Sequence, residues 1–347
     1  ANKLLREEDP AKWLYVPSWK RLLPRAGDPP LPSENWLVFA DRDGFVSRLA
    51  AQAACTVITV RAGDRFEQQD TRRFTIDPEN PQHYRQLLQA LQAAHFVPTT
   101  IVHGWGLERA IGLDQGLSVG FYSLVFLARA IGAAKLRHEI GLSVLSEGVQ
   151  DVLGTETLSP EKAALLGPCL VIRQEYPNIH VRSIDLDSSA RADLVLGELH
   201  APEDHVFVAH RNGQRWVQTY ERIVTDGVRS PVFRQGGVYL LTGGLGRVAT
   251  AIARHLGEKY QARLALVGRC GSAPQTLLDD LRKRGAEVLY ACADAADEAA
   301  MQQAVAETCE RFGTLHGVIH GAGVVGRDGY QELKHAGRHG GGPHFRA

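Results

Sequence analysis

The chain has 347 residues, of which 44% are hydrophobic, and its 39 Lys and Arg residues balance 39 Asp and Glu residues. This length allows about two domains of ordinary size, and the hydrophobic content is sufficient for a buried core in each. A formal net charge of zero gives no field that would attract nucleic acid or an anionic membrane, so we expect neither as a partner.

In the first half of the chain, apolar runs alternate with stretches of helical character. The expected strands are residues 36–40, 55–60, 99–102, 141–145 and 179–184, and the expected helices include residues 84–94 and 120–134. Such alternation favours a mainly parallel sheet with helices on its faces. The most apolar segment, residues 118–134, is interrupted by Arg129 and is short for a membrane-spanning helix, so we expect a buried helix there.

The turn after the first strand argues against a dinucleotide in this half. It reads Asp41-Arg-Asp-Gly44, with two acids where a phosphate needs bare backbone and positive potential. His103, beside Trp105 at another expected strand end, is interpreted as a packing or interface residue rather than a catalytic one. Strand character returns over residues 205–223.

A glycine-rich turn follows the apolar run Val238 to Leu241. Gly244, Gly246 and Ala249 have the G-x-G-x-x-G/A spacing, in which a pyrophosphate lies at the N-terminus of the following helix. Apolar residues then recur at helical spacing, and a second strand over 264–267 completes a βαβ pattern. The predicted cofactor-binding residues of this turn are Thr242, Gly243, Gly244, Leu245 and Gly246.

The end of the second strand indicates which dinucleotide is bound. NAD sites commonly place an acid about 20 residues past the fingerprint, whereas an Arg there can accommodate a 2'-phosphate. This chain has Arg269 and no acid, which favours NADP(H) over NAD(H). The alternative is that Arg269 is only a solvated loop cation.

Two further strand ends would lie along the same edge of the sheet. A third strand over 287–292 ends in Ala293 and Asp294, and a fourth over 315–319 ends in His320-Gly321-Ala322-Gly323. Open α/β sheets bind ligands outside the carboxyl ends of their strands. Asp294 either accepts a hydrogen bond from the adenine amino group or caps the helix that carries Met301, and both interpretations stay open.

These motifs together resemble the ketoreductase domain of modular polyketide synthases, a subgroup of the short-chain dehydrogenase/reductases. The motifs are Thr242-Gly-Gly-Leu-Gly, Val267-Gly-Arg269, Ala293-Asp294 and His320-Gly-Ala-Gly323. The upstream half is similar to the cofactor-free structural subdomain of that family, in Tyr15-Val-Pro-Ser-Trp19, Gln174-Glu-Tyr-Pro177, Arg182-Ser-Ile-Asp185 and Arg211-Asn-Gly-Gln-Arg-Trp216.

The resemblance implies an α/β fold of two Rossmann-like subdomains with mainly parallel sheets, the second incomplete at its C-terminus. We expect residues 1–230 to form the structural subdomain, residues 231–325 the N-terminal part of the NADPH-binding subdomain, and residues 326–347 an irregular or disordered tail. The five cysteines are scattered, without a C-x-x-C pair, which favours reduced thiols in the cytoplasm. The chain starts without Met, so we expect it to be a piece of a longer protein.

The family reduces the 3-oxo group of an acyl chain on an acyl carrier protein, with hydride from NADPH and a Ser, Tyr and Lys downstream of the His-x-Ala-Gly strand. Only 24 residues follow Gly323 in the 347-residue chain, so the catalytic part is predicted to be missing. Tyr330 and Lys334 match Y-x-x-x-K, but they follow the fourth strand too closely to be expected in catalysis. Val325-Gly-Arg327 resembles the stereochemical class that lacks Leu-Asp-Asp.

Three functions remain open at this point. The chain is either an NADPH-dependent ketoreductase part that is inactive alone, with an acyl carrier protein and neighbouring synthase domains as partners, or a non-catalytic pseudo-ketoreductase scaffold. An epimerase or reductase acting on a nucleotide sugar fits the fingerprint but not the upstream half. We expect no metal site, because His335, His339 and His344 lie in a flexible end.

Overall fold

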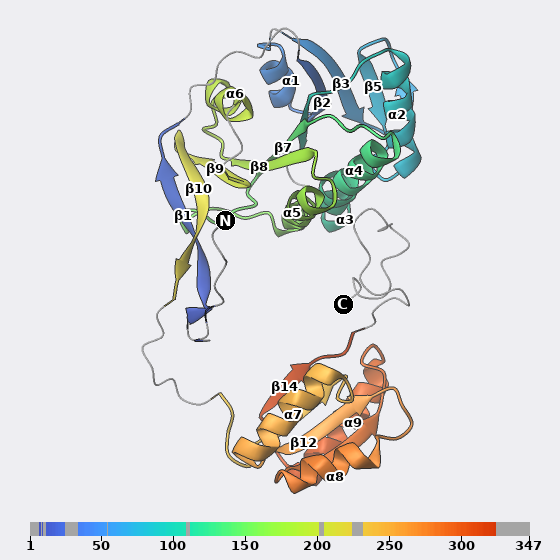
Figure 1. Ribbon diagram of the computed structural model, residues 1–347, viewed down its shortest axis with the longest axis vertical. Helices are drawn as coiled ribbons and strands as arrows, with labels where there is room; N and C mark the ends of the chain where they lie inside the picture. The colour runs from blue at the N-terminus through green and yellow to red at the C-terminus, as the bar shows by residue number, and fades with distance from the viewer. Residues whose placement is uncertain are drawn as a thin grey trace. The chain divides into compact units, whose positions relative to one another are not determined.

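The computed structural model describes residues 7, 9, 12–24, 34–53, 55–108, 112–200, 205–223 and 232–323. These residues divide into two compact units, the first within residues 1–225 and the second within residues 226–330 (Figure 1). The predictions for Val325, Arg327, Tyr330, Lys334 and the three histidines of the tail lie outside the described residues.

The first unit is built on a ten-stranded sheet with the order β1-β10-β9-β8-β7-β6-β2-β3-β5-β4. Its strands are β1 (Tyr15–Leu22), β2 (Asn35–Ala40), β3 (Thr56–Ala62), β4 (Glu67–Gln68), β5 (Arg73–Ile76), β6 (Thr100–Gly106), β7 (Ile140–Glu147), β8 (Ile179–Leu186), β9 (Phe207–Arg211) and β10 (Gln214–Arg222). The strands from β9 to β5 are all parallel, while β1, β10 and β4 pair antiparallel at the two edges. The parallel strands have the doubly wound order, which reverses between β2 and β6.

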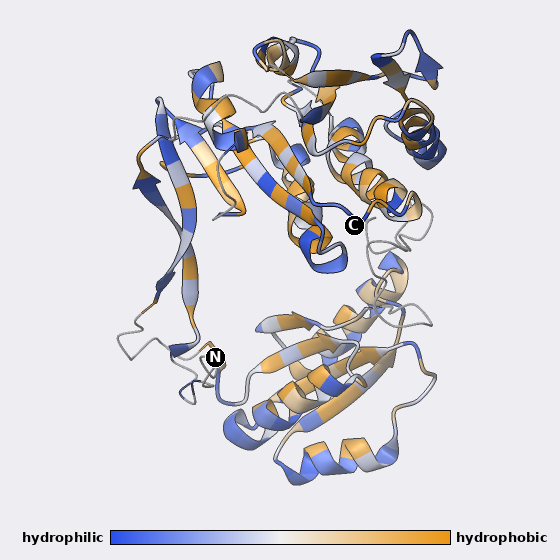
Figure 2. Ribbon diagram, turned by 45° about the horizontal axis from the view of Figure 1, so that its top comes forward, coloured by the Kyte–Doolittle hydropathy of each residue, from blue (hydrophilic) through white to orange (hydrophobic). Residues whose placement is uncertain are grey.

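Helices cover both faces of this sheet. They are α1 (Phe45–Ala50), α2 (Pro81–Ala93), α3 (Leu113–Gly116), the π-helical turn η2 (Leu117–Tyr122), α4 (Ser123–Ala133), the 3-10 turn η3 (Pro160–Leu165), α5 (Leu166–Glu175) and α6 (Ala192–His200). Leu37 and Phe39 of β2 point into a core shared with α2, α4 and α5, and Trp36 and Val38 point into a second core shared with α1 and α6. Figure 2 shows hydrophobic residues along many of the strands, whereas the helices carry both hydrophobic and hydrophilic residues.

One continuous helical run, Leu113 to Ala133, contains the apolar segment noted in the sequence. It has 21 residues, so the expectation that it is too short to span a membrane was wrong. In the described part of the chain it is the one helix that length and composition would allow to do so. However, 67% of its most apolar window is buried, and its side chains belong to the core beneath the sheet, which confirms the expected buried helix.

The second unit has a four-stranded parallel sheet in the order β13-β12-β11-β14. Its elements are β11 (Val238–Thr242), α7 (Arg247–Tyr260), β12 (Arg263–Gly268), α8 (Gln275–Lys283), β13 (Glu287–Cys292), α9 (Glu298–Phe312) and β14 (Gly317–His320). Helices α7 and α8 pack on one face and α9 on the other. This order also reverses beside the first strand, between β11 and β14, and it confirms the predicted α/β class with mainly parallel sheets.

The two units differ at the fourth parallel strand. In the first unit β6 lies between β2 and β7, whereas among the described residues of the second unit β14 pairs with β11 alone. Ile101 pairs with Leu37 and is 0% exposed, and Val318, at the matching register beside Leu240, is 58% exposed. Within residues 232–323, the sheet of the second unit therefore ends at β14, where an apolar position is exposed.

Candidate functional site

The carboxyl ends of the four strands of the second unit bring all the predicted cofactor residues to one edge of the sheet. In the strand register Thr242 lies beside both Val267 and His320, and Gly268 lies beside Cys292. Each strand end is followed directly by predicted residues: Thr242 to Gly246 after β11, Arg269 after β12, Ala293 and Asp294 after β13, and Gly321, Ala322 and Gly323 after β14.

Two glycines of the turn after β11 are required by close packing. Gly243 has a φ of 64°, and a Cβ there would lie 2.6 Å from the carbonyl oxygen of Gly321. A Cβ on Gly244 would lie 2.8 Å from the Cβ of Leu266, and the Gly244 N–H donates to the Val267 carbonyl at 3.0 Å. The bare backbone of this turn thus rests against both neighbouring strand ends, where any side chain would fill the cradle.

The helix that follows this turn, α7, begins without a side-chain cap. The helix begins after Gly246, and its first turn contains no acidic residue. The residue at its first position is a cation, Arg247, although the N-terminal end of the helix dipole favours negative charge. The unpaired N–H groups of this turn are the partners that a pyrophosphate needs.

In the first unit, a carboxylate of the chain itself lies at the N-terminus of the helix that follows the first parallel strand. Asp41, at the end of β2, accepts hydrogen bonds from the backbone N–H groups of Phe45 at 2.8 Å and Val46 at 2.7 Å, at the start of α1. Asp41 is 6% exposed, so its carboxylate occupies the position of an anion at that helix end. A phosphate is excluded there, while no side chain of the described residues caps the equivalent end of α7 in the second unit.

A tie at the base of the site joins the β11 and β14 turns. The Thr242 hydroxyl lies 2.8 Å from His320 Nδ1, and the Ala322 N–H donates to the same hydroxyl at 3.4 Å. The Gly321 N–H donates to the Thr242 carbonyl at 3.1 Å. His320 was seen in the sequence only as part of a motif, because its contact with Thr242 depends on the strand register.

Arg269 is presented by a loop that is fixed from the next strand. Its side chain is exposed and makes no ion pair within the described residues. The Tyr290 hydroxyl of β13 lies 3.1 Å from the Gly268 carbonyl oxygen and 2.5 Å from that of Cys270, on either side of Arg269. Burial raises the pKa of Tyr290, so the hydroxyl stays protonated and acts as a donor to this loop.

Asp294 does not cap helix α9, so that interpretation was wrong. The cap is Asp297, whose carboxylate accepts the Ala300 N–H at 3.1 Å. Asp294 instead closes the turn that precedes the helix, accepting the Ala296 N–H at 3.0 Å through one carboxylate oxygen. The Ala293 N–H donates to the Gly268 carbonyl at 3.0 Å, which holds the ends of β12 and β13 together.

His103 occupies the register position in the first unit that His320 occupies in the second. His103 pairs with Phe39 as His320 pairs with Thr242, and both begin a His-Gly-x-Gly sequence. However, His103 is 0% exposed, stacks on Phe39 and lies 3.0 Å from the Ser123 hydroxyl. Burial lowers its pKa to about 3, so it is neutral, and these contacts favour the packing interpretation.

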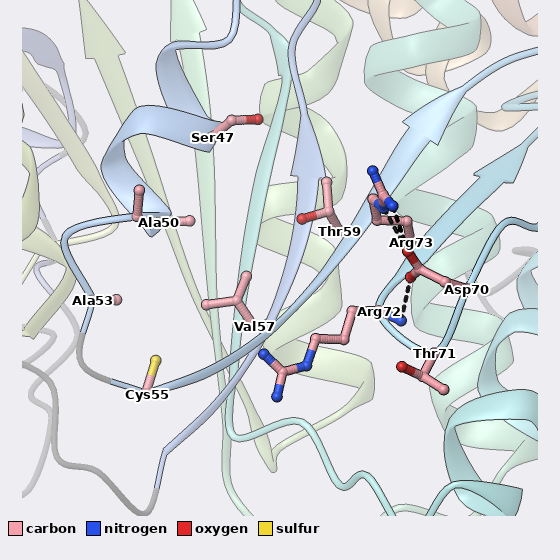
Figure 3. Close-up of a pocket in the computed structure, with 11 residues that line it drawn as sticks. Ser47, Ala50, Ala53, Cys55, Val57, Thr59, Asp70, Thr71, Arg72 and Arg73 are labelled. Carbon is pink, nitrogen blue, oxygen red and sulfur yellow. Dashed lines mark hydrogen bonds and ion pairs between the residues drawn. The ribbon is translucent and has the colours of Figure 1, made fainter.

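The first unit also has a groove of about 580 Å³, but it lies away from the ligand edge of its sheet (Figure 3). Ala50, Cys55, Val57 and Arg72 are among its lining residues. They precede or begin the strands β3 and β5, at the amino ends of the sheet. Ligands of open α/β sheets bind at the carboxyl ends, so this groove is not a relic of a dinucleotide site.

Comparisons with known proteins agree with this geometry. Residues 34–201 match the family described as beta-ketoacyl synthase-like, N-terminal, and residues 237–337 match the KR domain. Polyketide synthase PksM of Bacillus subtilis (strain 168) is 29% identical over 204 residues, which are 55% of this chain and 5% of PksM. Polyketide synthase ThaG of Burkholderia thailandensis is 27% identical over 318 residues, which are 89% of this chain and 5% of ThaG.

Solved structures show the same likeness over both units. An N-terminal ketoreductase from the macrolactin assembly line is 25% identical, with a TM-score of 0.70, over 90% of this chain and 65% of that one. A multidomain structure with adenylation, ketoreductase and pseudo Asub domains, from a keto acid-selecting NRPS module, is also 25% identical, with a TM-score of 0.72, over 90% of this chain and 28% of that one.

A doubly wound sheet with a glycine-rich turn and an uncapped helix at its carboxyl edge defines a Rossmann-type fold. Residues 237–337 match the KR domain, and most of the chain is similar to ketoreductases of solved structure and to polyketide synthases, as the resemblance in its sequence implies. It spans about a twentieth of the two synthases and 65% of the macrolactin ketoreductase.

Proposed function

We propose that the chain provides the NADPH-binding part of a ketoreductase that reduces the 3-oxo group of an acyl chain carried on an acyl carrier protein. The observation that carries the proposal is the contrast between the two helix N-termini, since α1 is capped by Asp41 and α7 is left without a side-chain cap. KR domains of this type use NAD(P)H, and Arg269 favours the 2'-phosphate form.

Each part of the edge has a role in holding the cofactor. The α7 N-terminus would bind the pyrophosphate, Arg269 the 2'-phosphate, and the free carboxylate oxygen of Asp294 the adenine amino group. The backbone of Gly321 to Gly323 would lie against the nicotinamide side, at the point where the strand order reverses. When bound, NADPH supplies the hydride for the reduction.

Among the described residues, no tyrosine hydroxyl is free at this edge to donate the proton that the family's reaction needs. The Tyr290 hydroxyl is directed to the β12 loop, and the Thr242 hydroxyl is bonded to His320 Nδ1. We therefore propose that the chain alone binds the cofactor without turning over a substrate. Its proposed partners are an acyl carrier protein and neighbouring synthase domains in the cytoplasm, since its relatives are polyketide synthases.

A pseudo-ketoreductase scaffold is the second candidate, and the same lack of a free tyrosine hydroxyl at this edge among the described residues favours it. The nucleotide-sugar alternative has no support, because the matches are to ketoreductases and polyketide synthases. Titration with NADPH, followed by the fluorescence of the nicotinamide, separates the two remaining functions. A scaffold that has lost the ligand would show no saturable signal.

The Arg269→Gln variant tests the cofactor choice within the same titration. Loss of a charge-assisted interaction costs about 1.5–3 kcal/mol, so the Kd for NADPH should rise by about 10- to 150-fold. The Kd for NADH should stay unchanged, since that cofactor has no 2'-phosphate. Arg234→Gln is the matched control, because Arg234 is also exposed but precedes β11 at the amino end of the sheet. Equal losses for NADPH and NADH would refute the role given to Arg269.

A further inference from the structure

Two exposed cysteines flank Arg269 at the cofactor edge. Cys270 follows Arg269 in the loop after β12, and Cys292 is the last residue of the neighbouring strand β13. Cys292 pairs in register with Gly268, two residues before Cys270. Neither cysteine takes part in the proposed function.

The side chains of β13 converge on this loop from one face of the sheet. Tyr290 and Cys292 are two residues apart in a strand, so their side chains project to the same side. The Tyr290 hydroxyl lies 2.5 Å from the Cys270 carbonyl oxygen, and Cys292 Sγ lies 3.8 Å from that of Arg269. The Cα of Cys270 is the next backbone carbon after that carbonyl, about 2.8 Å from its oxygen by standard peptide dimensions.

These distances set a limit on the reach between the two residues. The Cys292 sulfur lies 3.8 Å from the Arg269 carbonyl oxygen, and that oxygen lies about 2.8 Å from the Cys270 Cα. The sulfur is therefore at most about 6.6 Å from the Cys270 Cα. A closed disulfide holds the two Cα atoms about 4.4–6.8 Å apart and brings each sulfur nearer to the opposite Cα than this limit, so closure needs side-chain rotation together with movement of the exposed loop.

The other three cysteines do not share this arrangement. Cys169 is buried, and burial raises its thiol pKa to about 12, which makes it inert. Cys55 is half-buried, and burial and nearby Glu34 raise its pKa. Cys309 is exposed on α9, away from the β12 loop in sequence and on the other face of the sheet. Cys309 thus provides an exposed control thiol.

We propose that Cys270 and Cys292 form an oxidisable dithiol whose reaction partner is a small-molecule disulfide of the glutathione type. One cysteine attacks the disulfide, forming a mixed disulfide and releasing one small thiol. The other cysteine then attacks the mixed disulfide, closing the Cys270–Cys292 bond and releasing the second small thiol. The two cysteines are oxidised, the reagent is reduced, and both cysteine protons end on the released thiols.

Closure of this bond would displace the loop that carries Arg269. The Cys292 sulfur would leave the Arg269 carbonyl, and the Cys270 backbone would be drawn from its contact with Tyr290. This consequence rests on the proposed cofactor function: the oxidised chain should bind NADPH several-fold more weakly than the reduced chain, with little change for NADH. Such reversible disulfides are the type that reducing compartments use for control rather than for stability.

The experiment exposes the full chain to oxidised glutathione and reads intact mass and maleimide-reactive thiols under native conditions. The Cys309→Ser variant should lose two reactive thiols and the mass of two hydrogen atoms, the wild type should show the same closure together with one glutathione adduct on the exposed Cys309, and dithiothreitol should reverse both changes. Cys270→Ser and Cys292→Ser should each retain a glutathione adduct on the remaining cysteine, because the second step has no partner.

Separate adducts on both cysteines of the wild type, or disulfide-linked dimers, would overturn the proposal whether or not NADPH binds. Closure of the bond with unchanged NADPH affinity would keep the dithiol and overturn its effect on the cofactor. Absence of any NADPH binding in the reduced chain would refute the proposed function and leave the thiol chemistry standing on its own readout.

Discussion

Replacement of Asp41 by Ala should destabilise the first unit without weakening cofactor binding by the second. The variant removes two short hydrogen bonds to the Phe45 and Val46 N–H groups at a buried helix end. Loss of an N-cap costs about 0.5–2 kcal/mol, and the lost attraction between the carboxylate and the helix dipole contributes about 0.3–1 kcal/mol. Because the site is buried, we expect about 2 kcal/mol of unfolding free energy to be lost.

Tryptophan fluorescence during urea unfolding is the appropriate assay. All five Trp residues lie before residue 225, so the signal reports the first unit alone. With an m value of about 2–3 kcal/mol/M, the urea midpoint should fall by about 0.7–1 M. Asp43→Ala is the matched control, since Asp43 lies in the same turn and is exposed. Equal midpoints for the two variants, or a parallel loss of NADPH binding in Asp41→Ala, would refute the self-capping argument.

Three further outcomes follow from burial and charge. Val102→Asp should prevent folding of the first unit, whereas Val318→Asp should change the melting temperature little, because these valines are 0% and 58% exposed. Both variants can be followed by circular dichroism during heating. A similar loss of stability for both would mean that the β14 face is covered. Burial lowers the pKa of the His103 imidazole to about 3, so as the pH falls below about 6.5 the unfolded chain takes up a proton there before the folded chain does. The free energy of unfolding should therefore decline toward pH 3 by up to about 1.4 kcal/mol per pH unit. The His103→Asn variant should show a shallower decline in denaturation series over this range. Thr242→Val removes the hydroxyl to which the Ala322 N–H donates at the buried end of β11, so the Kd for NADPH should rise about tenfold. An unchanged Kd would show that this hydrogen bond does not support cofactor binding.

The strands of both sheets could be predicted because buried parallel strands are continuous apolar runs. The expected strand at 287–292 has the bounds of β13, and the run at 238–241 is β11 apart from its last residue. The short edge strands β4 and β5 were missed, since they lie in a charged segment with one apolar pair. The pairing of β1 with β10 joins residues about 200 positions apart, which no local pattern can reveal.

The features of the site that depend on the backbone could be predicted from the sequence. Glycine spacing and strand ends placed Gly244, Arg269 and Gly321 at one edge of the sheet, because topology alone brings the carboxyl ends of parallel strands together. The side chains that brace this edge were not predictable. Tyr290 reaches the β12 loop only through the strand register, and the choice of Asp297 over Asp294 as helix cap depends on where α9 begins.

The two units illustrate how one architecture is closed or left open at the ligand edge. Both place His-Gly-x-Gly at the same register of the fourth parallel strand, beside the point where the strand order reverses. In the first unit Asp41 satisfies the helix and His103 is packed against Phe39, so the edge is completed by the chain itself. In the second unit Thr242 takes the place of Phe39, His320 is exposed, and α7 begins without a cap. The glycine-rich turn therefore removes the chain's own anion from the helix end, and under the proposed function the pyrophosphate of the cofactor takes its place.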